Sequence, residues 1–347
     1  MKHYSVIFIL VIAAMMLLFT GAFAQDTLTI LTYDSFAVSS DLVEAFENEN
    51  NVKLQFIEAG AGGEVIARAV LTKDDPIADV IIGFDFSQFG KVFTNDILEA
   101  YDSPELTNIP DIYQLDTKNR ALPFNYGEIC INYDKRYFAD HDLAIPTSLD
   151  DLLKPEYKGL LVTQDPSGSN TGIGFLIATI EKYGEDGFVD YWNGLIRNGL
   201  VIGNSWSSTY YTNFSAASGS GEQPMVVSYT TSPAAEYIYS ETGDAPTDSL
   251  TSDGMCYRSI EFCGILKNSK NTELAKKFID AFIGKEWQED LPMQMFVYPV
   301  NELAELPEEF QLYGKPAVNP VMPDPELVAE KHDEWVRIWA EEVLVNY

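Results

Sequence analysis

The chain of 347 residues carries 53 acidic and 22 basic side chains, which gives a formal net charge of −31 at pH 7, and 46% of its residues are hydrophobic. This composition supplies core for roughly two globular domains and argues against a disordered chain. The acidic charge argues against nucleic acid and anionic lipid surfaces as partners, because both are bound by clustered Lys and Arg.

The first segment has the three-part pattern of a secretory signal peptide. A positive start at Lys2 precedes an apolar run over residues 6–18, and the small residues Ala22 and Ala24 stand before Gln25. The run is too short to span a membrane, which takes about 20 apolar residues. No cysteine follows it for lipid attachment. We therefore expect residues 1–24 to be removed and the product to be periplasmic.

Strands and helices alternate in the next part of the chain. Residues 28–32, 52–58 and 78–83 are apolar or alternating runs typical of strands, and helical spacing predicts helices over 39–51 and 64–72. The last of these strands is apolar throughout, as in a buried parallel sheet. This order predicts a right-handed, parallel, doubly wound sheet.

The rest of the chain continues the α/β pattern. Further strands are predicted at 124–134, 159–163, 226–229 and 255–266, helices at 172–183, 273–282 and 326–347, and loops at 215–222 and 241–253. Two long strands, near 121–127 and 255–264, are placed to connect two lobes. We predict one lobe from 25–122 and 262–300 and a second from 123–261 and 301–347. Each would be a mostly parallel sheet flanked by helices, with a ligand cleft between them that closes by hinge motion.

The three cysteines are Cys130, Cys256 and Cys263, an odd number that leaves at least one unpaired. Cys256 and Cys263 are seven residues apart on one predicted strand, so they face opposite ways and are not expected to form a bridge. We expect these cysteines to serve as small buried apolar residues. There is no Cys-x-x-Cys and no Cys/His cluster, so we expect no zinc site.

Catalysis has little support in the sequence. After the signal segment the only histidines are His141 and His332, both in polar surroundings. The sequence has no Gly-x-Ser-x-Gly, no His-Glu-x-x-His and no P-loop lysine. We therefore expect a binding protein without catalytic residues or a cofactor.

Aromatic residues stand beside turn residues at the ends of several predicted strands. The clusters are at 33–36, 124–127, 206–211, 229–233 and 298–300. Any one of these rings is equally explained by core packing, but five clusters at strand ends favour a site for a planar or cationic ligand. The loop 165–172 precedes a helix, and its hydroxyls and free amides suit a phosphate, carboxylate or hydroxyl group, although an ordinary capped loop has the same pattern.

With these motifs the chain resembles the periplasmic thiamine-binding proteins of ABC importers, within the type II solute-binding proteins. Tyr33-Asp34-Ser35-Phe36 and the run Ser228-Tyr-Thr-Thr-Ser-Pro233 are the more specific matches, and the resemblance covers nearly the whole chain after residue 24. It implies the two-lobed type II periplasmic-binding-protein fold, no catalysis, and delivery of a small ligand to a membrane permease. We expect a monomer.

The resemblance also implies a set of ligand-binding positions. Those matching the family's pocket are Tyr33, Ser169, Trp206, Tyr210 and Tyr229, to which we add Asp85, Asn170 and Phe296. The chain departs from the family's pattern in having Ala61 and Asn125 where aspartates are usual, Phe86 where an asparagine is usual, and Phe296 where a tryptophan is usual. Glu64, Asp85 or Glu128 would be the residues to compensate for the lost polar contacts.

The sequence therefore leaves three classes of ligand as alternatives. Thiamine or its phosphates lead, since Trp206 and Tyr229 would face the rings and Ser169 the hydroxyl or phosphate tail. Ferric ion is the alternative, because Tyr210 and Tyr211 form the adjacent tyrosine pair that iron-binding relatives use. Another small cationic or aromatic solute is the third.

Overall fold

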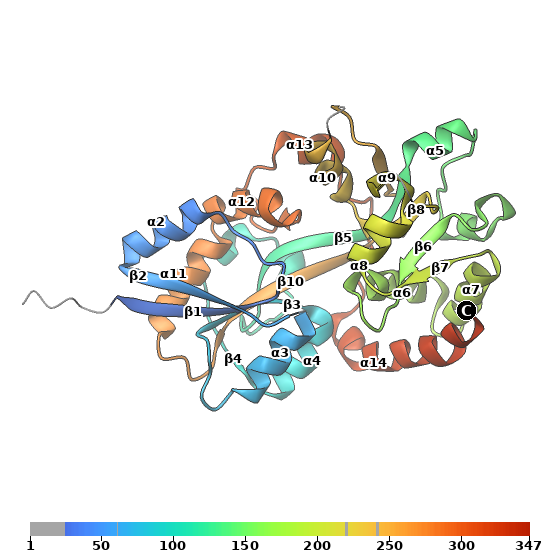
Figure 1. The fold of residues 1–347 in the computed structure, drawn as a ribbon. Helices are drawn as coiled ribbons and strands as arrows, with labels where there is room; N and C mark the ends of the chain where they lie inside the picture. The colour runs from blue at the N-terminus through green and yellow to red at the C-terminus, as the bar shows by residue number, and fades with distance from the viewer. Residues whose placement is uncertain (1–24, 61, 219–220, 241–242) are drawn as a thin grey trace, which may run out of the picture.

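The computed structural model describes residues 25–60, 62–218, 221–240 and 243–347, so the predicted signal segment 1–24 and Ala61 lie outside the described residues. Two lobes lie side by side, joined by strands that run from one to the other (Figure 1). No described helix is both long and apolar enough to cross a membrane.

The first lobe is built on three parallel strands, as predicted. These are β1 (Asp26–Thr32), β2 (Val52–Glu58) and β3 (Val80–Asp85), and β1 lies between the other two. Its helices are α2 (Ser40–Asn50), α3 (Gly62–Leu71), α4 (Phe89–Thr94), α11 (Thr272–Ile283) and α12 (Lys285–Met295). The apolar faces of α2 and α11 meet in one core, where the Phe46 and Phe278 ring centroids are 5.7 Å apart. Burial of these faces fixes the helices on the sheet.

Two long strands connect the lobes, as predicted, and Figure 1 shows both running from one lobe to the other. They are β5 (Leu122–Asp134) and β10 (Tyr257–Leu266), which pair antiparallel. Strand β10 also pairs antiparallel with β3, and β5 pairs with β8. The order is therefore β2-β1-β3-β10-β5-β8-β6-β7. The two parallel sets are joined through β10 and β5 into one sheet rather than standing as separate sheets.

The second lobe carries a shorter parallel set. Its strands are β8 (Met225–Tyr229), β6 (Leu161–Gln164) and β7 (Val201–Gly203). Its helices are α5 (Lys135–Asp140), α6 (Asn170–Tyr183), α7 (Phe188–Arg197), α8 (Trp206–Ser208), α9 (Ser215–Ser218), α10 (Ser232–Tyr239) and α13 (Glu308–Tyr313). Short strands at the margins complete the sheet: β4 (Leu98–Glu99), β9 (Thr247–Leu250) and β11 (Tyr298–Pro299).

Two predicted loops contain regular structure. The loop predicted at 241–253 includes β9, which pairs with the far end of β5 from Ile131 to Asp134. The loop predicted at 215–222 begins with α9. Both segments are polar, and contacts with the folded sheet decide their structure instead of local apolar patterning.

The last helix, α14 (Pro325–Glu342), contacts both lobes. It packs against α4 and the short helix η1 (Phe86–Gln88) of the first lobe. In the second lobe Trp339 lies edge-on against Trp192 of α7, with centroids 5.5 Å apart. The helix predicted to reach residue 347 ends at Glu342, and a separate turn covers Leu344–Asn346.

The prediction that the cysteines are unbridged is wrong for two of them. Cys130 on β5 and Cys256, just before β10, form a disulfide with their Cα atoms 4.5 Å apart. Ile129 and Tyr257 are paired across β5 and β10, so the next positions outward, 130 and 256, face each other. Cys263 is free and buried, as the odd count and its position on β10 predicted.

Candidate functional site

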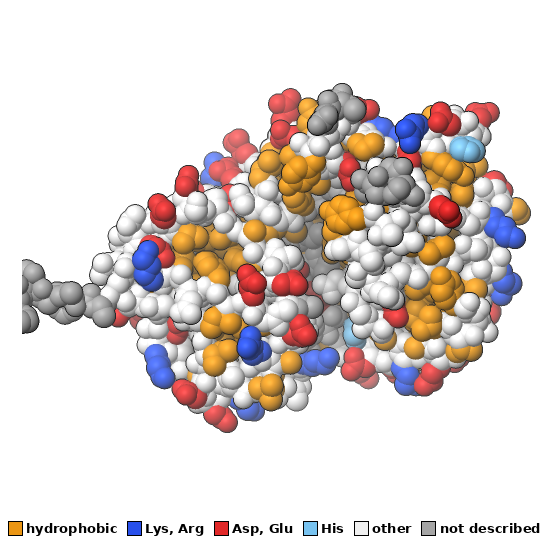
Figure 2. Space-filling model, viewed as in Figure 1, with side chains coloured by type: hydrophobic (Ala, Val, Ile, Leu, Met, Phe, Trp, Pro, Cys, Tyr) orange, Lys and Arg blue, Asp and Glu red, His pale blue; other side chains and the backbone are white. Residues whose placement is uncertain are grey.

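Three neighbouring strands bring polar side chains into one row between the lobes. Glu261 on β10 is paired with Asp85 at the end of β3 on one side and with Asn125 of β5 on the other. The pairing with β5 shifts register between Glu261 and Phe262, and the pairing with β3 shifts one residue later, between Phe262 and Cys263. Such irregularities re-aim side chains and are common beside functional sites. Figure 2 shows a hollow between the lobes with acidic side chains at its margin.

Two tyrosine rings flank this row, each lying on a glycine. The Tyr33 ring lies over Gly83 of β3, where a Cβ would be 1.8 Å from a ring carbon, and Gly83 has a φ of +95°. The Tyr229 ring lies over Gly127 of β5, 3.3 Å from the place of a Cβ. The glycines let both rings approach the sheet on either side of Glu261.

The Glu261 carboxylate is held by two donors from different strands. Tyr33 Oη donates to it at 3.2 Å, and Asn125 Nδ2 donates at 2.9 Å. Burial raises the pKa of the Glu261 carboxyl, and the neighbouring Asp85 carboxylate raises it further. Burial also raises the pKa of Asp85, against the hydrogen bonds from Ser87 that lower it. The row is therefore a half-buried acidic pair, set beside the fully buried Asn125, whose ionised form is disfavoured.

Trp206 extends the aromatic wall from the second lobe. Its indole stacks on Tyr210 with centroids 5.0 Å apart, lies 6.4 Å from the Tyr229 ring, and donates from Nε1 to Ser228 Oγ at 2.8 Å. The ring is only partly buried. The structure thus brings Trp206, Tyr210 and Tyr229 together. Tyr229 also lies near the acidic pair, because burial and the Glu261 and Asp85 carboxylates raise the pKa of its hydroxyl.

Ser169 and Asn170 stand at the beginning of α6. The Ser169 hydroxyl does not cap the helix but contacts Thr171 Oγ1 at 2.9 Å. Thr171 in turn donates to Gln164, whose amide donates to Thr209 beside Tyr210. A buried polar chain therefore ties this helix start to the segment that carries Trp206. Asn170 itself is exposed.

Phe296 and Tyr211 lie apart from this row. Phe296 lies in a different apolar cluster, near Phe310 and Tyr239, with ring centroids 6.3 and 6.0 Å away. Its neighbour Met295, by contrast, does reach Tyr33, with Sδ 4.0 Å from the hydroxyl. Tyr211 is 56% exposed, whereas its neighbour Tyr210 is buried against Trp206. The adjacent tyrosines therefore present their hydroxyls in different environments.

The structure also narrows the residues proposed to compensate for lost contacts. Glu128 is fully buried and bound to Arg258 and to the Ala317 amide, so its charge is already paired. Glu261 was missed in the sequence. Its signal was a single acidic residue within the apolar run of β10, which becomes informative only once β3 and β5 are known to flank that strand.

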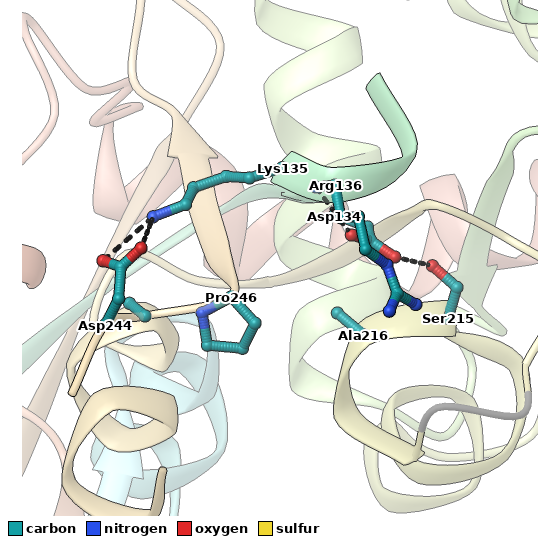
Figure 3. A pocket seen from close by; sticks show the side chains of 8 residues that line it. Asp134, Lys135, Arg136, Ser215, Ala216, Asp244 and Pro246 are labelled. Atoms are coloured by element: carbon teal, nitrogen blue, oxygen red, sulfur yellow. Dashed lines mark hydrogen bonds and ion pairs between the residues drawn. The ribbon is translucent and has the colours of Figure 1, made fainter. Parts of the chain in front are cut away.

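A separate cavity of about 470 Å³ lies at the far end of β5, beside the first residues of α5 and α9 (Figure 3). Lys135 forms an ion pair with Asp244 in this cavity, and the Ser215 hydroxyl donates a hydrogen bond to Asp134. None of the predicted site residues lines it. Among the described residues there is also no group of three or more His, Cys, Asp or Glu side chains arranged to hold a metal ion.

Comparison with known proteins agrees with this geometry. Residues 75–318 match the family described as "Bacterial extracellular solute-binding protein". The chain is 30% identical over 332 residues to the thiamine-binding periplasmic protein of Salmonella typhimurium, covering 92% of this chain and 94% of that one. It is 29% identical to the protein of the same name from Escherichia coli, covering 91% and 93%.

Solved structures show the same architecture. A periplasmic thiamin-binding protein superposes with a TM-score of 0.77 and 26% identity, covering 93% of this chain and 98% of that one. The ferric-binding protein of Campylobacter jejuni, at 20% identity and a TM-score of 0.74 over 90% and 98% of the two chains, shares the fold. The family match over residues 75–318 and the relative at 30% identity show that the chain belongs to the bacterial extracellular solute-binding proteins, a family of binding proteins and not of enzymes.

Proposed function

We propose that this protein captures thiamine or a thiamine phosphate outside the cytoplasm and delivers it to an ABC importer. The observation that carries the proposal is the half-buried acidic pair, Asp85 and Glu261, with Tyr33 and Tyr229 beside it and Trp206 next to Tyr229. Aromatic faces attract a cationic ring, and carboxylates complement its charge. The names of the relatives that align over nine-tenths of the chain support the same ligand.

The arrangement assigns a part of the ligand to each lobe. Tyr33, Asp85 and Glu261 would hold the charged, amino-bearing rings, and Trp206 and Tyr229 would cover them from the second lobe. Ser169 and the start of α6 would take the hydroxyl or phosphate tail. The buried polar chain links this helix start to the segment that carries Trp206 and Tyr210.

The iron alternative is less well supported by the geometry. Tyr210 is buried in stacking against Trp206, and burial raises the pKa of its hydroxyl well above the ordinary value. An iron(III) site needs ionised phenolates, and here ionisation of Tyr210 is disfavoured.

Titration calorimetry with thiamine, thiamine monophosphate and iron(III) citrate tests the proposal. Trp206→Ala should weaken thiamine binding by about 30- to 1,000-fold, which corresponds to about 2–4 kcal/mol of lost stacking, cation–π attraction and burial. Trp206→Phe keeps a ring face and should lose less. Tyr211→Phe, at the exposed ring, is the matched control and should change thiamine affinity little.

Two results would contradict the proposal. One is the absence of heat with either thiamine compound. The other is a visible phenolate-to-iron absorption band with iron citrate that Tyr210→Phe or Tyr211→Phe abolishes. Mass spectrometry of the small molecules released on denaturing the purified protein gives an independent identification.

A further inference from the structure

The acidic row contains more acceptors than its own hydrogen bonds use. Asn125 is fully buried and gives its Nδ2 to Glu261, but its Oδ1 has no hydrogen-bond partner among the described residues. A buried acceptor left open costs about 1–3 kcal/mol unless something binds it. The open oxygen and the donor to Glu261 belong to the same amide, so an unsatisfied acceptor lies within one side chain of the acidic pair.

The pair itself is unfavourable when both carboxyls are ionised. Asp85 and Glu261 are direct cross-strand partners on β3 and β10, and like charges in such positions destabilise a sheet. The donors on Glu261 are the neutral groups Tyr33 and Asn125, and those on Asp85 come from Ser87. The described hydrogen bonds thus supply no cation that would neutralise the two charges.

We propose that Asp85 and Glu261 share one proton in the empty cleft, and that a cationic ligand displaces this proton and occupies the acceptor site they form with Asn125. This inference rests on the proposed function for the identity of the ligand. The charge balances: the empty pair carries one proton and one negative charge. The bound pair carries two negative charges and one ligand cation, and the proton passes to the buffer.

The burial described above supports this exchange, since the pKa of both carboxyls is raised in the ligand-free protein. Linkage then gives the sign of the pH effect. A ligand that binds the ionised pair and releases a proton binds more tightly as pH rises, by about tenfold per unit until the pair loses its proton unaided. The other titratable groups that interact with the pair are Tyr33, Tyr229, Tyr257 and His332. His332 acts on the pair through its charge, which lowers the pKa of Asp85.

Calorimetry with thiamine in two buffers of different ionisation enthalpy, repeated from about pH 5 to pH 8, measures the protons released. Wild type should release close to one proton where the pair is protonated. Glu261→Gln keeps an acceptor for Tyr33 but removes the second carboxyl. It should abolish the release and weaken binding at the high end of the range by about 10- to 100-fold.

Two control variants separate this exchange from general charge effects. Asp34→Asn removes an exposed carboxylate next to Tyr33 and should leave both the proton release and the affinity nearly unchanged. His332→Gln removes the imidazole whose charge lowers the pKa of Asp85, and it should leave the release intact. Equal proton release in wild type and Glu261→Gln, or none at any pH, would overturn the exchange.

A ligand-free measurement keeps this inference distinct from the identity of the ligand. Carbon-13 NMR of labelled carboxyls should show one carboxyl titrating above the ordinary range in wild type. In Glu261→Gln the Asp85 signal should return toward that range. If thiamine gives no heat but this titration holds, the proposed ligand is wrong and the shared proton stands. If both carboxyls titrate normally, the shared proton is wrong whatever the ligand.

Discussion

Loss of the Cys130–Cys256 disulfide should reduce the free energy of unfolding by about 5 kcal/mol. The bridge closes a loop with a sequence separation of 126 residues, for which the chain-entropy relation gives about 5 kcal/mol at 25 °C. The variant should carry Cys130→Ala and Cys256→Ala together, since a single substitution leaves a reactive partner thiol. Equilibrium unfolding in urea, fitted at a common slope, gives the difference in free energy.

Cys263→Ala is the matched control because Cys263 is also fully buried but unbridged. It removes one sulfur without removing a cross-link, and should cost about 1–2 kcal/mol through the small cavity. A double variant that loses no more than twice the control value would refute the argument. Its loss would then come from the deleted sulfur atoms and not from the constraint on the unfolded chain.

Three further predictions follow from the packing of the site and the crossing strands. Gly83→Ala should cost about 1–3 kcal/mol of stability and at least tenfold in thiamine affinity, because its Cβ would overlap the Tyr33 ring. Gly63→Ala, which meets nothing within 4 Å, should not destabilise the protein in the same thermal and calorimetric assays. Glu128→Gln should cost about 3–5 kcal/mol in urea unfolding, because the largely buried Arg258 guanidinium loses its counter-charge. The control Asp75→Asn, in an exposed ion pair, should cost under about 1 kcal/mol. Equal losses in the two variants would contradict this prediction. Small-angle scattering should show a smaller radius of gyration with saturating ligand, and an unchanged radius would count against closure of the lobes.

Much of the fold was predictable from the sequence because local patterning determined it. The strand at Val52–Glu58 was predicted with its observed bounds, and the parallel order of β1, β2 and β3 followed from right-handed crossovers. The lobe boundaries at residues 122/123, 261/262 and 300/301 remain predictions.

What sequence reasoning missed depends on the pairing of β5 with β10. That register places Cys130 opposite Cys256 and Asn125 beside Glu261, across 126 and 136 residues of chain. Spacing along one strand carries no information about such a partner. The same holds for β9, whose polar sequence forms a strand because it pairs antiparallel with residues 131–134 of β5. The aromatic part of the site was more predictable, since Trp206, Tyr210 and Tyr229 stand beside turn residues.

The position of β10 also bears on how the chain is exported. Residues 257–266 fill the place between β3 and β5, so the centre of the sheet stays open until most of the chain has been synthesised. Contacts of such long sequence separation form slowly, because the intervening chain must first be brought together. We predict that a precursor still carrying residues 1–24 therefore has time to reach the translocation machinery in an unfolded form. Substitutions that speed the pairing of β10 should improve folding in the test tube and impair secretion in the cell.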